Sequence, residues 1–144
     1  MDFTERFAQQ NANNATNNAI NNAIEEPVKK ERKNLHAQVK IMLSASEDRK
    51  GPTFGKGAAI LLHGIEDNGS LNKTAKNLHM AYSKAWSMIK KVEDGLGFQL
   101  IDRYGARGSK LTEDGREFLK LYDAYEKKVE TYAEKSFREI FKEF

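Results

Sequence analysis

The side chains best suited to chemistry gather in one segment, from Tyr82 to Val92. A helical wheel at 100° per residue places its apolar side chains, Ala85, Ile89 and Val92, on one side. The opposite side carries hydroxyl and ammonium groups, at Ser83, Ser87 and Lys90, and Lys84 and Lys91 flank it on one side. Such groups donate hydrogen bonds to phosphate oxygens and base acceptors, and this side of the segment is expected to hold no carboxylate. The pattern predicts a surface that binds a polyanion such as duplex DNA.

Two aromatic residues on the remaining flank of the same segment allow two interpretations. Tyr82 and Trp86 lie four residues apart, so they share one side of a helix. Packing against the next element of the fold is the simpler interpretation, and contact with DNA bases is the alternative. Both residues are therefore candidate DNA contacts.

The composition does not favour an enzyme. The chain has three histidines and no cysteine, and its acids show no paired spacing that would suit acid and base catalysis. His63 is interpreted as a surface or boundary histidine and not as a metal ligand. We predict no catalytic residue, no metal site and no cofactor.

The elements that must position this surface form a predicted helix-turn-helix between Gly69 and Gly97. Ser70 is a suitable N-cap for a first helix, whose Ala75 is small enough for a close helix crossing. The second helix is the cationic segment described above, and it ends at Gly97. Lys73 and Lys76 of the first helix join the candidate DNA contacts.

The flanking segments complete a winged fold. A strand over 35–43 with a short return at Thr53 and Phe54 predicts a β-hairpin, and residues 58–67 predict a supporting helix. After Gly97, a second hairpin is expected, with its tip running from Gly105 to Lys110. The cations at this hairpin, which suit contact with a DNA backbone or minor groove, are Arg103, Arg107 and Lys110. An ordinary basic surface turn is the alternative.

A long helix capped by Thr112 is expected to run to the C-terminus. Its apolar stripe has heptad-like spacing and consists of Phe118, Tyr122, Tyr125, Val129 and Tyr132. A helix of about 30 residues, about 45 Å long, exceeds what a small domain covers. We predict that the stripe pairs with a second copy of the chain, giving a homodimer; folding back onto its own domain is the alternative.

Length, charge and composition define the organisation of the 144 residues. Residues 1–34 are an Asn-rich low-complexity tail and a charged linker, for which disorder is expected, with a weak helix on docking as the alternative. Residues 35–112 are the predicted winged helix-turn-helix domain, and 113–144 the C-terminal helix. Residues 51–111 contain nine lysines and arginines and five acids, so this segment has a net charge of +4. Without cysteines, a leader or an apolar run of membrane length, a cytoplasmic protein is expected.

Several motifs suggest a family. They are GS at 69–70, AK at 75–76, AYSKAW at 81–86, LIDR at 100–103 and LTEDG at 111–115. Together they resemble the N-terminal DNA-binding domain of the ModE-type molybdate-responsive regulators and, more distantly, the winged helix-turn-helix of LysR-type regulators. The resemblance implies sequence-specific binding of double-stranded DNA by a homodimer that controls transcription.

Two departures from these families bear on the prediction. Ala81 stands where a capping Ser is usual, so the second helix is expected to lack a side-chain cap. The chain also ends where the oxyanion-binding region of ModE regulators would begin, so molybdate binding is not supported. The expected fold is mainly α (α+β), a winged helix-turn-helix with a leading β-hairpin and a long C-terminal helix. The rival function is a protein–protein interaction module that uses this fold as a scaffold.

Overall fold

A computed structural model describes residues 2, 4–6, 8–9, 32–105 and 108–144 of the chain. The chain divides into two compact units, Met1–Leu35 and His36–Phe144. In the first unit, residues 4–6 and 8–9 are helical, and the amide of Glu5 donates to Asp2 Oδ1 at 2.8 Å. Most of the predicted disordered tail lies outside the described residues, so that expectation stays a prediction.

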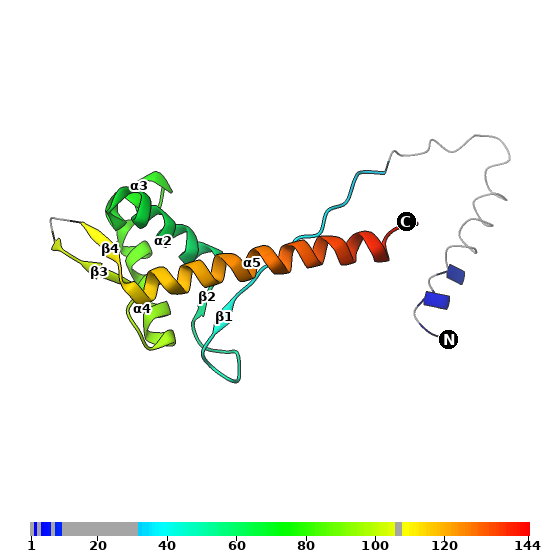
Figure 1. The fold of residues 1–144 in the computed structure, drawn as a ribbon, viewed down its shortest axis with the longest axis horizontal. Coiled ribbons are helices and arrows are strands. Elements are labelled where there is room, and N and C mark those ends of the chain that lie inside the picture. Colours follow the sequence, from blue (N-terminus) through cyan, green and yellow to red (C-terminus); the bar gives the residue numbers. More distant parts are fainter. Residues whose placement is uncertain (1, 3, 7, 10–31, 106–107) are drawn as a thin grey trace. The chain divides into compact units, whose positions relative to one another are not determined.

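The second unit contains four helices and two small antiparallel hairpins among its described residues (Figure 1). In chain order they are β1 (Leu43–Ser44), β2 (Thr53–Phe54), α2 (Lys56–Asn68), α3 (Leu71–Asn77), α4 (Tyr82–Leu96), β3 (Ile101–Arg103), β4 (Ser109–Leu111) and α5 (Glu113–Ile140). The predicted winged helix-turn-helix, with its leading hairpin and long C-terminal helix, is confirmed.

The helix-turn-helix forms as its capping residues predict. The backbone amide of Lys73 donates to Ser70 Oγ at 3.2 Å, which satisfies one free amide at the start of α3. Helix α4 begins after Ala81 without a side-chain cap and ends at Gly97, whose φ is 82°. His79, in the turn between the helices, adopts a left-handed φ of 53° that sequence reasoning did not anticipate.

A close crossing of α2 and α3 supports this motif. Ala75 of α3 is buried as expected. Helices α2 and α3 approach each other closely at Gly64 and Thr74, where a Cβ on the glycine would overlap the threonine side chain. The buried Thr74 hydroxyl donates to the carbonyl oxygen of Ser70 at 2.8 Å. The missing side chain at Gly64 therefore determines how closely α3 can lie on α2.

Aromatic packing joins the first turns of α5 to the rest of the core. The ring of Phe54 lies 4.8 Å from Phe118 and 4.9 Å from Tyr122, both edge to face. Phe54 and Tyr122 are fully buried, as are Leu61 of α2 and Ile89 of α4. The core is thus shared by the leading hairpin, the three shorter helices and the start of α5.

The leading hairpin is much shorter than predicted, and the strand expected over 35–43 is wrong in extent. Only Leu43 and Ser44 pair, with Phe54 and Thr53 respectively. The returning strand stops at Phe54 because α2 begins at Lys56, so the preceding residues have no strand to pair with. Residues 36–42, named here the N-terminal strap, contact α5 instead: Ala37 N donates to Glu134 Oε2 at 3.2 Å.

The wing is tied to the helix-turn-helix through its second strand. β3 and β4 pair Ile101 with Leu111 and Arg103 with Ser109. The amide of Ser109 donates to the carbonyl oxygen of Gly69, in the turn before α3, at 2.9 Å. Gly108 has a φ of 98°, and a Cβ there would overlap that same carbonyl. Glycine is therefore required for the close approach of the wing to this turn.

Helix α5 has the predicted cap and length. The amide of Gly115 donates to Thr112 Oγ1 at 2.9 Å, and Glu113 and Asp114 occupy the first turn. Its 28 residues span about 42 Å, well beyond the helical core (Figure 1). Across the described residues, no helix combines the length and apolar character needed to cross a bilayer.

Candidate nucleic-acid interface

The outer side of α4 has the composition predicted from the helical wheel. Ala85, Ile89 and Val92 are buried against the core. The cationic face on the other side is exposed at all five of its residues, Ser83, Lys84, Ser87, Lys90 and Lys91. Helix α4 therefore presents hydroxyl and ammonium donors to solvent along most of its length.

One part of this prediction is wrong, because the cationic face does contain a carboxylate. Lys90 Nζ lies 3.3 Å from Asp94 Oδ1, one helical turn further along α4. Residues four apart share a helix face, so the acid lies beside the lysine. Both side chains are more than half exposed, and such a pair contributes little to stability. Within the described part of the chain, the other four members of the face form no ion pair.

The two aromatic residues of α4 have different environments. Tyr82 is 47% exposed at the start of the helix and remains available to a partner. Trp86 is half-buried, and the guanidinium of Arg103 lies over its ring. This arrangement favours the packing interpretation of Trp86. It also connects the first strand of the wing to the middle of α4.

The remaining predicted contacts lie on α3 and the wing. Lys73 and Lys76 are exposed on α3, and Arg103 is exposed on β3. Lys110 belongs to β4, not to the wing tip as expected, and pairs with Asp102 in the strand register. Its ammonium lies 5.8 Å from the centre of the Tyr104 ring. Arg107 lies outside the described residues.

A hollow joins α3, α4 and the wing. It has a volume of about 340 Å³, and it is lined by Ser70, Asn72, Tyr82, Gly105, Gly108 and Ser109. One surface depression thus lies where the start of α3, the start of α4 and the wing meet. A nucleic-acid backbone that crosses α4 at Tyr82 would pass beside the wing.

Glu93 is a positioning residue that sequence reasoning missed. Its buried carboxylate accepts hydrogen bonds from the amides of Leu100, at 2.7 Å, and Ile101, at 3.4 Å. These amides mark the entry to β3, so the carboxylate fixes the wing relative to α4. The helical wheel contained the signal, since Glu93 is four residues after Ile89 and therefore on the inner side.

The stripe on α5 predicted to mediate dimerisation is divided between two environments. Phe118 and Tyr122 pack on Phe54 in the chain's own core, so their assignment to a dimer surface is wrong. Tyr125 and Tyr132 are 52% and 72% exposed, and Val129 is half-buried.

Tyr122 also holds the N-terminal strap on α5. Its hydroxyl donates to the carbonyl oxygen of Ile41 at 3.1 Å and lies 3.2 Å from Glu126 Oε2. Burial, together with the negative charge of Glu126, raises the pKa of the Tyr122 hydroxyl to about 12. The neutral hydroxyl is therefore the form that the fold stabilises.

Residues 60–116 match the family model of the bacterial regulatory helix-turn-helix proteins of the lysR family. That range runs from α2 through α3, α4 and the wing into the first turn of α5. The match confirms the LysR-type helix-turn-helix and supports the predicted function, a DNA-binding regulator of transcription. It does not test the closer resemblance to ModE-type regulators.

A solved structure is also similar to the chain. It is described as "Crystal Structure of BenM_DBD/benA site 1 DNA Complex" and has 24% sequence identity and a TM-score of 0.47. The similarity covers 58% of this chain and 94% of that chain. No protein with a curated description matches the chain.

Proposed function

We propose that the chain is a cytoplasmic, homodimeric regulator that binds specific sequences of double-stranded DNA through α4 and the wing. The observation that carries this proposal is the cationic face of α4, fully exposed along a helix whose other side is buried. A helix of this width enters the major groove, where serine and lysine donate to base edges and phosphates. The lysR-family match to this segment supports the proposal.

The proposed contacts have separable roles. Lys84 and Lys91, seven residues apart, share one flank of the exposed side and are placed to reach the phosphate backbone along one edge of a groove. Ser83 and Ser87 lie at the centre of the exposed side and are placed to reach base edges. Phosphate contacts set the affinity and its salt dependence, whereas base contacts set the sequence preference.

Measuring DNA affinity against salt concentration tests the proposal directly. We expect the dissociation constant of a duplex selected from a random pool to rise steeply with salt. Lys84→Gln should reduce the slope of the logarithmic plot by about one and weaken binding to all sequences. Ser87→Ala should alter the preference at one base position and leave the slope unchanged.

Lys127→Gln is the matched control, since Lys127 is an exposed lysine on α5, away from α4 and the wing. It should bind like the wild type. Equal salt slopes for wild type, Lys84→Gln and Lys127→Gln would reject the cationic face as the contact surface. Lys90→Ala and Arg107→Ala should also weaken duplex binding without unfolding the protein.

Dimerisation is proposed through the exposed part of α5. Leu121, Tyr125 and Tyr132 have spacings of four and seven residues, and all are more than half exposed. A twofold dimer would place two copies of α4 about 34 Å apart, one turn of DNA. Tyr125→Glu should convert a dimer to a monomer in sedimentation, and Lys127→Glu should not. A wild-type monomer at micromolar concentration, with and without DNA, would exclude this arrangement.

The ModE-type resemblance remains a proposal that rests on the AYSKAW segment at 81–86. It concerns the DNA-binding part alone, so molybdate is not expected to bind. Thermal unfolding in the presence and absence of millimolar molybdate should give the same midpoint. A saturable increase in that midpoint would overturn this part of the proposal.

A further inference from the structure

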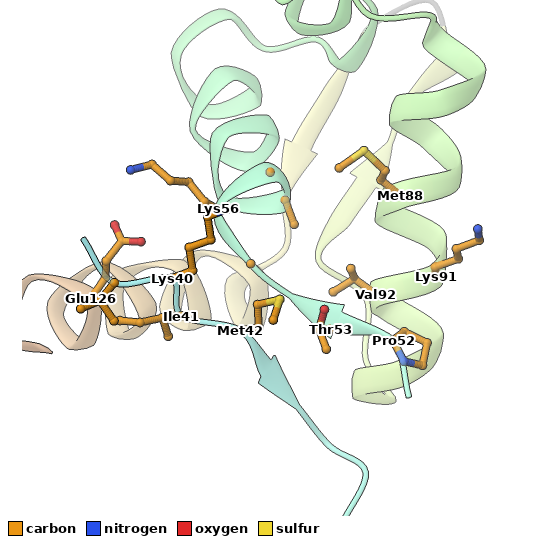
Figure 2. A pocket seen from close by; sticks show the side chains of 14 residues that line it. Lys40, Ile41, Met42, Pro52, Thr53, Lys56, Met88, Lys91, Val92 and Glu126 are labelled. Carbon is orange, nitrogen blue, oxygen red and sulfur yellow. The ribbon is translucent and has the colours of Figure 1, made fainter. Parts of the chain in front are cut away.

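A cavity of about 510 Å³ lies on the side of α4 next to the leading hairpin (Figure 2). Five parts of the chain form it: the strap residues that precede β1, Pro52 and Thr53 at the start of β2, the start of α2, the second half of α4, and Glu126 of α5. Its volume falls within the range of protein sites that bind small molecules, about 300–1,000 Å³. The cavity is separate from the hollow at the wing, and it contains only one residue of the cationic face, Lys91.

Most of the cavity wall is apolar and adaptable. Met42 and Met88 line it from the strap and from α4, with Val92 beside them (Figure 2). Methionine side chains are flexible and polarisable, so they fit ligands of different shapes. Gly57 makes room for this wall, since a Cβ there would lie 3.1 Å from the terminal methyl of Met88. These walls suit a hydrocarbon group.

The rim of the cavity carries a net positive charge. Lys40, Lys56 and Lys91 line it from three different elements, against one acid, Glu126. The carboxylate of that acid lies 3.2 Å from the Tyr122 hydroxyl. In Figure 2 the ammonium groups of Lys56 and Lys91 point away from each other, toward opposite sides of the view. Three lysines from the strap, α2 and α4 against one acid give the rim a positive potential, which favours an anion over a neutral or cationic ligand.

The backbone at the start of α2 adds to this potential. Helix α2 begins at Lys56 after Gly55, which supplies no side-chain cap, and its first turn contains no acid. The first amides of a helix have no partner within the helix, and they attract negative charge. Gly55, Lys56, Gly57 and Ala58 all line the cavity, so the start of the helix lies at its wall. The positive charge and the apolar wall thus belong to the same space.

We propose that this cavity is a binding site for a small carboxylate with a hydrocarbon body. The body would contact Met42, Met88 and Val92, and the carboxylate would lie among the lysines and the first amides of α2. Size limits the ligand to a small molecule, and charge selects an anionic head group. The proposal concerns binding to this cavity and does not depend on DNA binding.

Octanoate is a suitable probe, with octanol and octylamine as neutral and cationic controls of the same chain length. We expect octanoate to give saturable chemical-shift changes at Met42, Met88 and Lys56 in the full-length chain. Octanol should bind at least fivefold more weakly, and octylamine should not saturate. Equal binding of octanoate and octanol would overturn the carboxylate preference. If octanoate does not saturate the shifts by about 10 mM, the site itself is overturned.

Variants locate the binding. Lys40→Gln with Lys56→Gln should weaken octanoate binding about fivefold, as expected for the loss of two exposed charges. The matched control, Lys120→Gln with Lys127→Gln, removes two exposed lysines of α5 that do not line the cavity and should leave binding unchanged. Equal effects of the two pairs would show non-specific charge attraction and overturn the proposal.

Gly57→Leu provides an independent test, because its side chain would enter the cavity next to Met88. We expect it to abolish the octanoate shifts while the remaining spectrum and the unfolding midpoint show an intact fold. Unchanged octanoate binding in this folded variant would place the ligand elsewhere. Since none of these measurements uses DNA, their failure and the failure of the proposed regulator function are distinguishable.

Discussion

Replacing two glycines by alanine should change stability in opposite directions, although both lie in the first turn of a helix. Gly57 is in α2 and Gly115 is in α5. Alanine favours a helix over glycine by up to about 1 kcal/mol, and by less near a helix end. Propensity alone therefore predicts that both substitutions stabilise the protein slightly. The space around each Cβ predicts a different outcome.

At Gly115, a Cβ would overlap the carbonyl oxygen of Leu100, and it would lie 2.9 Å from the Cα and carbonyl carbon of that residue. Ordinary contacts begin at 3.4 Å, so the backbone before β3 would have to retreat. Gly115 is buried, and overpacking of this kind costs about 1–3 kcal/mol. After subtraction of the helix-propensity gain, we expect Gly115→Ala to lower the free energy of unfolding by about 2 kcal/mol.

At Gly57, the nearest atom is the flexible end of Met88, at 3.1 Å, which can shift by a few tenths of an ångström. Gly57→Ala should therefore raise the free energy of unfolding by about 0.5 kcal/mol. Urea unfolding of the wild type and both variants measures these changes, with unchanged m-values. In thermal unfolding, Gly115→Ala should lose roughly 10 °C. If Gly115→Ala is as stable as Gly57→Ala, the reasoning from the close contact with Leu100 is refuted.

Three other predictions follow from single contacts. Asp94→Asn releases Lys90 from its ion pair, so duplex affinity should increase about twofold to threefold in a salt-dependent manner; unchanged affinity would mean that Lys90 does not contact DNA. His79→Gly should raise the free energy of unfolding by up to about 1 kcal/mol, because glycine adopts the left-handed conformation without strain. Urea unfolding measures this change, and a less stable variant would contradict the prediction. For Tyr122, the pKa of about 12 in the folded protein exceeds the unfolded value near 10, so its contribution is complete below pH 10 and is lost as pH rises towards 12. The free energy of unfolding, measured from pH 9 to 11.5, should fall more steeply for the wild type than for Tyr122→Phe. Parallel curves would contradict the raised pKa of Tyr122.

Local signals predicted the central part of the fold well. The cap at Ser70, the inward row of Ala85, Ile89 and Val92, and the glycine at position 97 all depend on neighbours in sequence. These features follow from helix geometry and capping, which one sequence contains. The helix-turn-helix and the exposed composition of α4 were therefore predictable.

Features that depend on distant residues were not predictable in the same way. The alternation in residues 35–43 suits a strand, but a strand needs a partner of equal length, and α2 begins too soon to provide one. In α5, the heptad-like spacing marks Phe118 and Tyr122 as apolar positions without specifying what they contact. Phe54, distant in sequence, made them part of the chain's own core.

The candidate interface shows the same division. The exposure of the cationic face was predicted by the helical wheel. The pairing of Lys90 with Asp94 was missed because Asp94 lies beyond the segment that was placed on that wheel. The contact between Arg103 and Trp86 joins two elements, and it follows from no local pattern. For Glu93, the helical wheel predicts the inward position of the side chain, but it does not predict the two amides that bind the carboxylate.

The placement of Trp86 under Arg103 has a practical consequence. Trp86 is the single tryptophan of the chain, so intrinsic emission above the tyrosine range comes from one known position. A guanidinium stacked on the indole ring makes that emission sensitive to displacement of β3. Fluorescence of the unlabelled protein therefore provides a direct optical record of wing movement during titration with a duplex.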